Sequence, residues 1–343
     1  MDKKKRYILF FKISFFDFII LLIIFPFIFK LNKLIIIEVD IDGSKRGKTG
    51  PAIFNKGMRE VLPYSNKNCS FISSGKITLR NAKHKSDYYY ISLPSLSEKD
   101  YDNWVKSHKI KKLIIGPNFV PLNWFKFPSD IWKERRFPEI LKNIKKYVVH
   151  TDRVRDHLIK RSNTTNMINK FINLRPCSNL KPKKISPFEE RKVDIIFFEK
   201  YMDLNRTSQG KQLYNLLKNS KMKVELLRYG FYTKPQMEKL ANNSKFLIYF
   251  SFYDCGPIGL VEIQNYGVYF FTHQKELILD SKTGFYVPEL ANLDNMIKAY
   301  KIILNKIDLL VKSGIKSEII AKINQKNNIC QRTLDDLCKG IIS

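Results

Sequence analysis

Short apolar runs recur along the chain between longer stretches in which apolar residues repeat with helical spacing. This alternation is typical of parallel strands joined by crossover helices. The predicted strands span residues 34–39, 88–93, 113–115, 147–149, 193–198, 224–227, 246–250 and 268–272. The pattern therefore predicts an α/β protein with four strands in each half.

A stretch without periodicity separates the two groups of strands. Residues 174–192 contain three Pro and many charged residues, a composition typical of a connection. We expect two Rossmann-like open-sheet domains that face a cleft, one over residues 34–180 and the other over 181–343. In open α/β sheets ligands bind beyond the carboxyl ends of the strands, so the loops at that edge are the place to look for chemistry.

Residues 1–33 have a different character and predict a basic N-terminus followed by a membrane segment. Four basic residues at positions 3–6 precede the apolar stretch 7–29. Within it, residues 13–29 are apolar apart from Asp17, which is about the minimum length for a helix that crosses the hydrocarbon core. The basic cluster favours a cytoplasmic N-terminus with the globular body on the other side. A cleaved signal peptide, or a helix in the membrane surface with the body in the cytoplasm, is the alternative.

Composition excludes several protein classes. The 343 residues are 44% hydrophobic and 13% aromatic, too apolar for a disordered chain. The mean hydropathy of −0.27 excludes a protein with many membrane spans. The five Cys are far apart and form no CxxC pair, so neither a zinc site nor a disulfide framework is expected. Cys330 and Cys338 are predicted to be buried thiols on one face of a C-terminal helix.

The formal net charge of +29 directs attention to anionic partners: nucleic acid, a membrane surface or phosphorylated ligands. Of the 61 basic residues, 47 are Lys, scattered as on a solvated surface. A nucleic-acid binder would concentrate them on one face with interleaved aromatics, or carry a reading helix, and the sequence shows neither. We therefore expect no nucleic-acid partner.

The most informative stretch is 246–288. A strand ends near Ser251, a loop carries Asp254, and a helix starts near residues 257–259 with Glu262 in its first turn. The start of a helix offers free N–H groups and a partial positive charge to a phosphate, while nearby acids can bind ribose hydroxyls. The arrangement predicts a cradle for a nucleotide diphosphate.

This stretch resembles the nucleotide-sugar site of GT-B glycosyltransferases, especially the retaining family 4. The resemblance lies in the acid spacing, in Gly267 after the helix and in Thr283-Gly284 further on. It implies that Glu262 holds the donor ribose and that Asp254 lies near the transferred sugar, both as catalytic residues. Two departures are Asp254 where the family usually has Glu, and Cys255-Gly256-Pro257 in place of Gly-Phe-Gly.

The resemblance also implies the reaction. A sugar would move from a nucleotide diphosphate donor to a carbohydrate, lipid or protein acceptor with retention of configuration. No cofactor and no metal ion are expected. Asp40 and Asp42 imitate a metal-binding DxD, but no partner acids follow them. The alternative is a GT-B-like protein that has lost catalysis and serves as a membrane-tethered binding or scaffold subunit.

The resemblance also implies an Arg and a Lys after the first strand of the second domain, where they would neutralise the donor diphosphate. Arg206 and Lys211 have a suitable spacing there, with Lys200 behind them, and Gly259 at the helix start is expected to approach the same diphosphate. Fixed cations stabilise the charge that develops on the leaving diphosphate. Arg206 can bind phosphate oxygens through two parallel hydrogen bonds.

The first domain offers a candidate loop for the acceptor or a phosphate. Gly43, Gly47 and Gly50 follow the first predicted strand, a position that resembles the glycine-rich loop of GT-B enzymes. Asn118 and His150 follow later strands and are further candidates, although a structural role for His150 is the alternative. Thr151 or Asp152 is predicted to cap the helix after His150.

Overall fold

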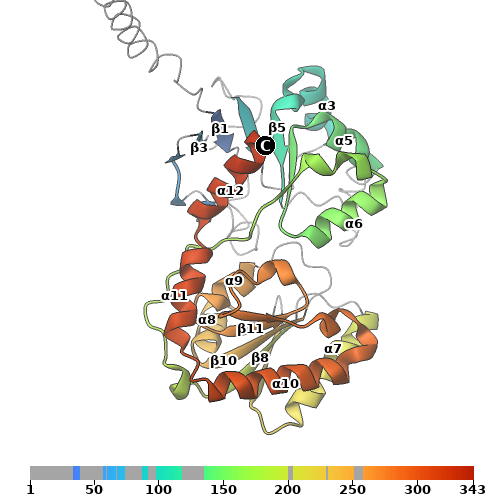
Figure 1. The fold of residues 1–343 in the computed structure, drawn as a ribbon. Helices are drawn as coiled ribbons and strands as arrows, with labels where there is room; N and C mark the ends of the chain where they lie inside the picture. Colours follow the sequence, from blue (N-terminus) through green and yellow to red (C-terminus); the bar gives the residue numbers. More distant parts are fainter. Residues whose placement is uncertain are drawn as a thin grey trace, which may run out of the picture.

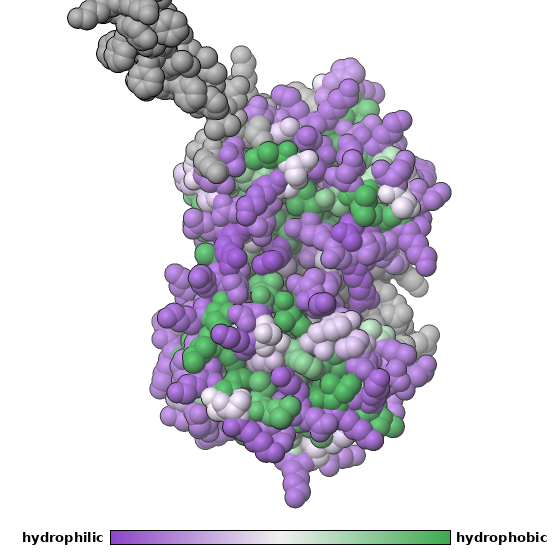
Figure 2. Space-filling view, viewed as in Figure 1, coloured by the Kyte–Doolittle hydropathy of each residue, from purple (hydrophilic) through white to green (hydrophobic). Residues whose placement is uncertain are grey.

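The computed structural model describes residues 34–38, 57–58, 60–66, 68–73, 87–91, 98–117, 135–199, 204–228, 231–250 and 258–343. These residues form two α/β lobes, drawn one above the other in Figure 1. The N-terminal lobe is uppermost in that view and the C-terminal lobe lies below it. Hydrophilic side chains cover most of the face of both lobes that Figure 2 shows.

The N-terminal lobe is built on a seven-stranded sheet with strand order β2-β3-β1-β4-β5-β6-β7. All its pairings are parallel except that of β2 with β3. The strands are β1 Leu34–Glu38, β2 Tyr64–Ser65, β3 Cys69–Ser73, β4 Tyr88–Ile91, β5 Leu113–Ile115, β6 Lys146–Val149 and β7 Phe171–Asn173. Because neighbouring strands are parallel, β1 and β4 to β7 all start at one edge of the sheet and end at the other.

Helices pack on this sheet through apolar side chains. They are α3 Glu98–Lys106, α5 Phe137–Asn143 and α6 Asp152–Ser162, with the 3-10 helices η3 Lys109–Lys112 and η6 Thr165–Lys170. Tyr101, Ile140 and Leu158 join one buried cluster with β5 and β6. Thr151 caps α6, because its side chain accepts a hydrogen bond from the Val154 N–H. The predicted cap is therefore confirmed at Thr151.

The C-terminal lobe holds a five-stranded sheet of order β12-β11-β10-β8-β9, in which every pairing is parallel. Its strands are β8 Val193–Glu199, β9 Val224–Arg228, β10 Ser244–Phe250, β11 Tyr269–Thr272 and β12 Gly284–Tyr286. Its helices are α7 Leu204–Lys218, α8 Lys234–Asn242, α9 Ile258–Gln264, α10 Met296–Lys312 and α11 Ser317–Asn327, with the 3-10 helices η7 Phe188–Glu190, η8 Lys275–Leu277, η9 Pro288–Ala291 and η10 Leu293–Asn295. The central strand β10 is buried almost throughout, which its continuous apolar sequence demands.

All eight strands predicted from the sequence are present, with ends within two residues of the predicted ones. The short strands β2, β3, β7 and β12 were not predicted. Each has too few residues, or too polar a sequence, for its periodicity to be read.

The last helix leaves the C-terminal lobe and returns to the N-terminal one. Helix α12, Cys330–Ile342, buries Leu334, Leu337 and Ile341 in the cluster formed by β3, β4 and β7. The sequence alone grouped these residues with the second domain, because helical periodicity does not reveal which lobe a helix covers.

Two disulfides attach α12 to the N-terminal lobe. Cys69 pairs with Cys338, and Cys177 pairs with Cys330. The expectation of free buried thiols at Cys330 and Cys338 is therefore wrong. Both residues are buried on one face of the helix as predicted, but their partners lie 153 and 269 residues away in the chain, so local spacing gave no sign of them.

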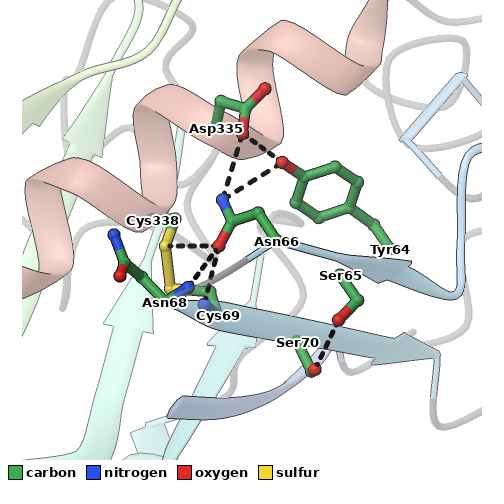
Figure 3. The surroundings of a disulfide bond; sticks show 8 residues. All are labelled: Tyr64, Ser65, Asn66, Asn68, Cys69, Ser70, Asp335 and Cys338. Carbon is green, nitrogen blue, oxygen red and sulfur yellow. Dashed lines mark hydrogen bonds between the residues drawn. A yellow bond between two sulfur atoms is a disulfide. The ribbon is translucent and has the colours of Figure 1, made fainter. Parts of the chain in front are cut away.

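The surroundings of the Cys69–Cys338 bond add polar contacts (Figure 3). Asp335 of α12 accepts hydrogen bonds from the Tyr64 hydroxyl and from Asn66, while the Asn66 side chain accepts from the Cys69 N–H at 2.8 Å. Burial and the contact with Asp335 raise the pKa of Tyr64 to about 12. Helix α12 is therefore held to β2 and β3 by hydrogen bonds as well as by the covalent bond.

The second disulfide lies where the chain crosses between the lobes. The first crossing follows β7 and carries Cys177, and the return crossing leads into α12 at Cys330. The Ser178 N–H donates to the Asn328 carbonyl at 3.0 Å, and the Cys330 N–H donates to Asn179 Oδ1 at 3.1 Å. The two crossings are thus joined side by side.

The predicted membrane segment, residues 7–29, lies outside the described residues. Of the helices that the described ranges form, none has the length and apolar character needed to cross a membrane.

Gly267 has a structural reason to be glycine. Its φ is +76°, and a Cβ atom there would lie 2.1 Å from the Ser317 carbonyl oxygen. We expect Gly267→Ala to lower the free energy of unfolding by about 2–3 kcal/mol, which combines left-handed backbone strain with the clash. Gly314→Ala is the matched control, since Gly314 has a φ of +69° and open space around it. Chemical denaturation would contradict this account if the two variants lost equal stability.

Candidate functional site at the facing sheet edges

The carboxyl ends of the two sheets point toward each other. Arg153 lies in the first turn of α6, just beyond β6, and His273 lies just beyond β11. Arg153 Nη1 donates to His273 Nε2 across the junction at 3.2 Å. Ile258, at the start of α9, packs into the buried cluster of the N-terminal lobe. The described residues therefore bring together the two edges at which open α/β sheets bind ligands.

Glu262 is a buried acid at this edge. It lies in the short helix α9 beyond β10, and its residue surface is only 3% exposed. Lys234 Nζ donates to Glu262 Oε1 at 3.1 Å. Burial raises the pKa of Glu262, while the charge and hydrogen bond of Lys234 lower it in part. A carboxylate held in this way can accept hydrogen bonds from ligand hydroxyl groups.

Lys234 is a site residue that sequence reasoning missed. It is the first residue of α8, which begins after β9, and it also approaches Glu238 at 3.9 Å. The Thr233 side chain and Gln236 form a capping box that fixes this helix start. The Thr-x-x-Gln pattern could have predicted this helix start. Nothing in the sequence distinguishes Lys234 from the other residues among the 47 Lys.

A second ion pair marks the ends of β8 and β9. Arg228 Nε donates to Glu199 Oε2 at 3.2 Å, and the Glu199 side chain is only 8% exposed. A Cβ atom on Gly210 would lie 3.3 Å from Glu199 Oε1 and 3.0 Å from the ring of Phe250. Helix α7 therefore packs closely over this edge of the sheet.

Gly259 lies in the first turn of α9, as the sequence predicted. A Cβ atom there would come within 3.2 Å of the Tyr232 hydroxyl and 3.3 Å of Phe198. The residue is partly exposed, so its backbone remains accessible beside Tyr232. Its role toward a diphosphate remains a prediction.

Arg206 and Lys211 both lie on α7, which follows β8 as expected. Arg206 is in the first turn, close to the carboxyl edge. Lys211 is exposed and lies seven residues after the first residue of the helix, about 10 Å along its axis. The helix thus places the backbone of Arg206 nearer the sheet edge than the backbone of Lys211.

His150 is buried between two strand ends. Its Nδ1 lies 2.6 Å from the Leu174 carbonyl oxygen, which ties the end of β6 to the end of β7. This contact gives His150 a structural role beside the predicted role at the acceptor.

The other predicted site residues lie outside the described residues. They are Asp254, Gly43, Gly47, Gly50 and Asn118, together with Lys200 and the departures Cys255, Gly256 and Pro257. Their roles stay predictions. Within the described ranges, no three His, Cys, Asp or Glu side chains gather in a way that could hold a metal ion.

The contact between Arg153 and His273 predicts a pH dependence. Burial and the positive charge of Arg153 lower the pKa of His273 from about 6.5 to about 3. In the unfolded chain His273 binds a proton below about pH 6.5, whereas in the folded chain it binds one only below about pH 3. The free energy of unfolding therefore falls as the pH falls through this window. We expect His273 to cost up to about 3 kcal/mol of stability between pH 7 and 4.5.

His273→Gln should therefore lose less stability than the wild type on acidification. Glu276 lies in the same region with Asp152 and Asp156, and burial raises its pKa, which acts in the opposite direction. The difference between variant and wild type isolates His273, and exposed His108→Asn serves as the control. Equal slopes of stability against pH in wild type and His273→Gln would refute the assignment.

Comparison with known proteins supports the architecture. No protein-family model and no curated protein sequence matches the chain. The sucrose-phosphate synthase of Thermosynechococcus elongatus superposes with a TM-score of 0.52 at 10% identity, over 90% of this chain and 99% of that one. A glycosyltransferase from Rickettsia africae ESF-5 matches at 0.46 with 16% identity, over 91% of this chain and 99% of that one. TarM matches at 0.49 with 12% identity, over 75% of this chain and 55% of the TarM chain. The match to the synthase and the two facing sheets, parallel apart from the pairing of β2 with β3, show that the chain has the GT-B fold.

Proposed function

We propose that this protein is a GT-B glycosyltransferase that moves a sugar from a nucleotide diphosphate donor to a carbohydrate, lipid or protein acceptor. The observation that carries the proposal is Glu262, a buried carboxylate paired with Lys234 at the carboxyl edge of the C-terminal sheet. This edge faces the N-terminal lobe. In the proposal, the C-terminal lobe binds the donor and the N-terminal lobe binds the acceptor on the opposite side. Sequence resemblance places a ribose-binding Glu at this position.

The pair has a simple physical function in this proposal. Ribose hydroxyls donate to an ionised carboxylate, and such charge-assisted bonds are stronger than neutral ones. Burial favours the neutral form of Glu262, and the charge and hydrogen bond of Lys234 favour its ionised form. Lys234 is therefore a positioning residue for the donor.

The remaining roles extend the resemblance. Arg206, supported by Lys211 and the backbone at Gly259, would neutralise the donor diphosphate as it leaves. Asp254 would lie near the transferred sugar. Retention of configuration and independence of a metal ion belong to the same proposal.

We also infer that the protein is attached to a membrane through residues 7–29, with its globular body on the oxidising side. The apolar sequence of that segment supports attachment. The two disulfides support the side, because such bonds persist in oxidising compartments and are rare in the cytosol.

A thermal-shift screen of nucleotides and nucleotide sugars tests donor binding. Ligands that bind only the folded state raise its melting temperature, by an amount that grows with concentration above the dissociation constant. We expect one nucleoside diphosphate and its sugar conjugates to stabilise the protein, and free sugars to have no effect. Absence of a shift across all common nucleoside diphosphates at millimolar concentration would count against a donor site.

A catalytically inactive binding protein is the second candidate. It is favoured by the unusual Cys255-Gly256-Pro257 sequence beside Asp254, since Pro257 lacks an N–H that could meet a phosphate. Assays of donor hydrolysis and transfer with the stabilising nucleotide sugar separate the two. Binding without either reaction would identify the inactive form.

A further inference from the structure

The N-terminal lobe carries a concentration of Lys at the edge opposite the candidate site. Lys111 and Lys112 directly precede β5, Lys145 and Lys146 introduce β6, and Lys170 directly precedes β7. Lys142 lies in the last turn of α5 at the same edge. These six residues are called the basic edge. One acid is described among the residues that lead into β4 to β7, namely Asp87 before β4.

The lysines of the basic edge lie close enough to affect one another. Burial, followed by the charge of Lys145, lowers the pKa of Lys146 and of Lys170. Lys111, Lys112 and Lys142 are exposed. Lys142 also complements the negative end of its helix, an ordinary structural use of a cation. The same explanation does not cover Lys145, which lies between α5 and β6 and stacks over the Tyr88 ring.

An exposed apolar side chain accompanies these charges. Ile168 lies two residues before Lys170 in the 3-10 helix η6 and is 51% exposed. The C-terminal end of α6 adds exposed Lys160 and Arg161 before the same segment. Cations beside an exposed aliphatic residue suit a lipid headgroup region, where charge meets an apolar layer.

The short stretch of chain between the apolar segment and β1 makes the basic edge face the side on which that segment lies. Strand β1 starts at Leu34, and the register places its start at the same edge as the starts of β5 and β6. Strands lie about 4.8 Å apart, so β7 is about 19 Å from β1 along the sheet. Only residues 30–33, which span at most about 14 Å, separate β1 from the apolar segment that ends at residue 29.

We propose that the basic edge is a docking surface for anionic lipid headgroups, which holds the N-terminal lobe against the membrane and directs the two facing sheet edges away from it. Figure 1 draws α3, whose last turn lies at this edge, at the end of the N-terminal lobe farthest from the C-terminal lobe. The inference rests on the proposed membrane segment only for the orientation of this edge, and it adds a second, electrostatic attachment. It does not depend on the proposed sugar transfer.

Lysine footprinting of the full chain tests this docking. The protein is mixed with vesicles of phosphatidylcholine alone, or with 30% phosphatidylglycerol, and lysines are acetylated briefly and located by mass spectrometry. We expect labelling of Lys111, Lys112 and Lys142 to fall about threefold or more on the anionic vesicles, and to recover in 0.5 M salt. Exposed Lys301, Lys316 and Lys322 of the C-terminal lobe should not change.

Charge reversal supplies a second measurement. The variant K111E/K112E/K142E is compared with K301E/K316E/K322E, which changes the net charge equally. Flotation with both vesicle types, and protection of Lys145 and Lys146, which both variants keep, that the first variant alone loses, supports the membrane segment and the basic edge together. Flotation with anionic vesicles alone, lost in the first variant, supports the basic edge and refutes the membrane segment. Equal labelling of the basic edge on both vesicle types, or no flotation with either, overturns the docking surface.

Discussion

Glu262→Gln is expected to lower kcat/KM for sugar transfer by at least about 100-fold while leaving the fold intact. The substitution keeps the size of the side chain but removes the charge that would accept two ribose hydroxyls, and hydrogen bonds to a charged group contribute about 1.5–3 kcal/mol each. Since Glu262 is buried and its ionisation opposed by burial, the neutral amide should not weaken the fold. Kinetics with the donor identified by thermal shift provide the measurement.

The variant Lys234→Met distinguishes a binding role from a merely structural pair. Without the ammonium group, the pKa of Glu262 rises further, so the carboxylate ionises only at higher pH. Activity of Lys234→Met should therefore recover as the pH rises, whereas that of Glu262→Gln should not. Glu225→Gln, an exposed acid on β9, is the control. Wild-type transfer rates in Glu262→Gln with an identified donor would remove Glu262 from the site.

Loss of the Cys177–Cys330 bond is expected to lower the melting temperature by about 6–7 °C. The bond closes a segment with a sequence separation of 153 residues, and cross-links of this span stabilise a fold by about 4–5 kcal/mol in the chain-entropy description. For a protein of this size each kcal/mol corresponds to about 1.4 °C. Differential scanning calorimetry of Cys177→Ser/Cys330→Ser gives the value directly.

Cys255→Ser provides the control, since Cys255 belongs to neither disulfide. Alkylation of the denatured chain offers an independent count: one of the five cysteines should react before reduction and all five after it. Alkylation at the moment of cell lysis also tests the oxidising compartment. Five reactive thiols in freshly lysed cells would exclude both disulfides in vivo.

The parallel strands could be predicted from the sequence, whereas the packing of α12 on the N-terminal lobe could not. β8 and β10 are buried on both faces and therefore appear as continuous apolar runs that no other element mimics. Helix α12 has ordinary amphipathic spacing, which is satisfied equally well by either lobe. Its place is decided by Cys69, Cys177 and the β3 surface, all distant in sequence.

The candidate site shows the same division. Glu262 and Gly259 could be found because they belong to one short segment in which a strand, a loop and a helix follow in order. The sequence could not identify Lys234, Arg153 and His273 as site residues. Their contacts with Glu262 and with each other form only when sheet edges from different parts of the chain meet. Spacing along the chain does not predict pairs of residues that are this far apart. Because Lys is abundant, its presence at position 234 also gave no indication of a site.

The paired crossings make the C-terminal lobe an insertion whose covalent attachments to the N-terminal lobe lie at one place. The Cα atoms of Cys177 and Cys330 lie 5.0 Å apart, so the chain leaves the N-terminal lobe and returns to it almost at one place. A protease cut anywhere between these two cysteines would leave both fragments covalently joined until a reductant is added. For the same reason, this intervening segment is a natural unit for exchange, and a donor lobe from another protein could be grafted between residues 177 and 330 if it supplies an apolar side chain in place of Ile258.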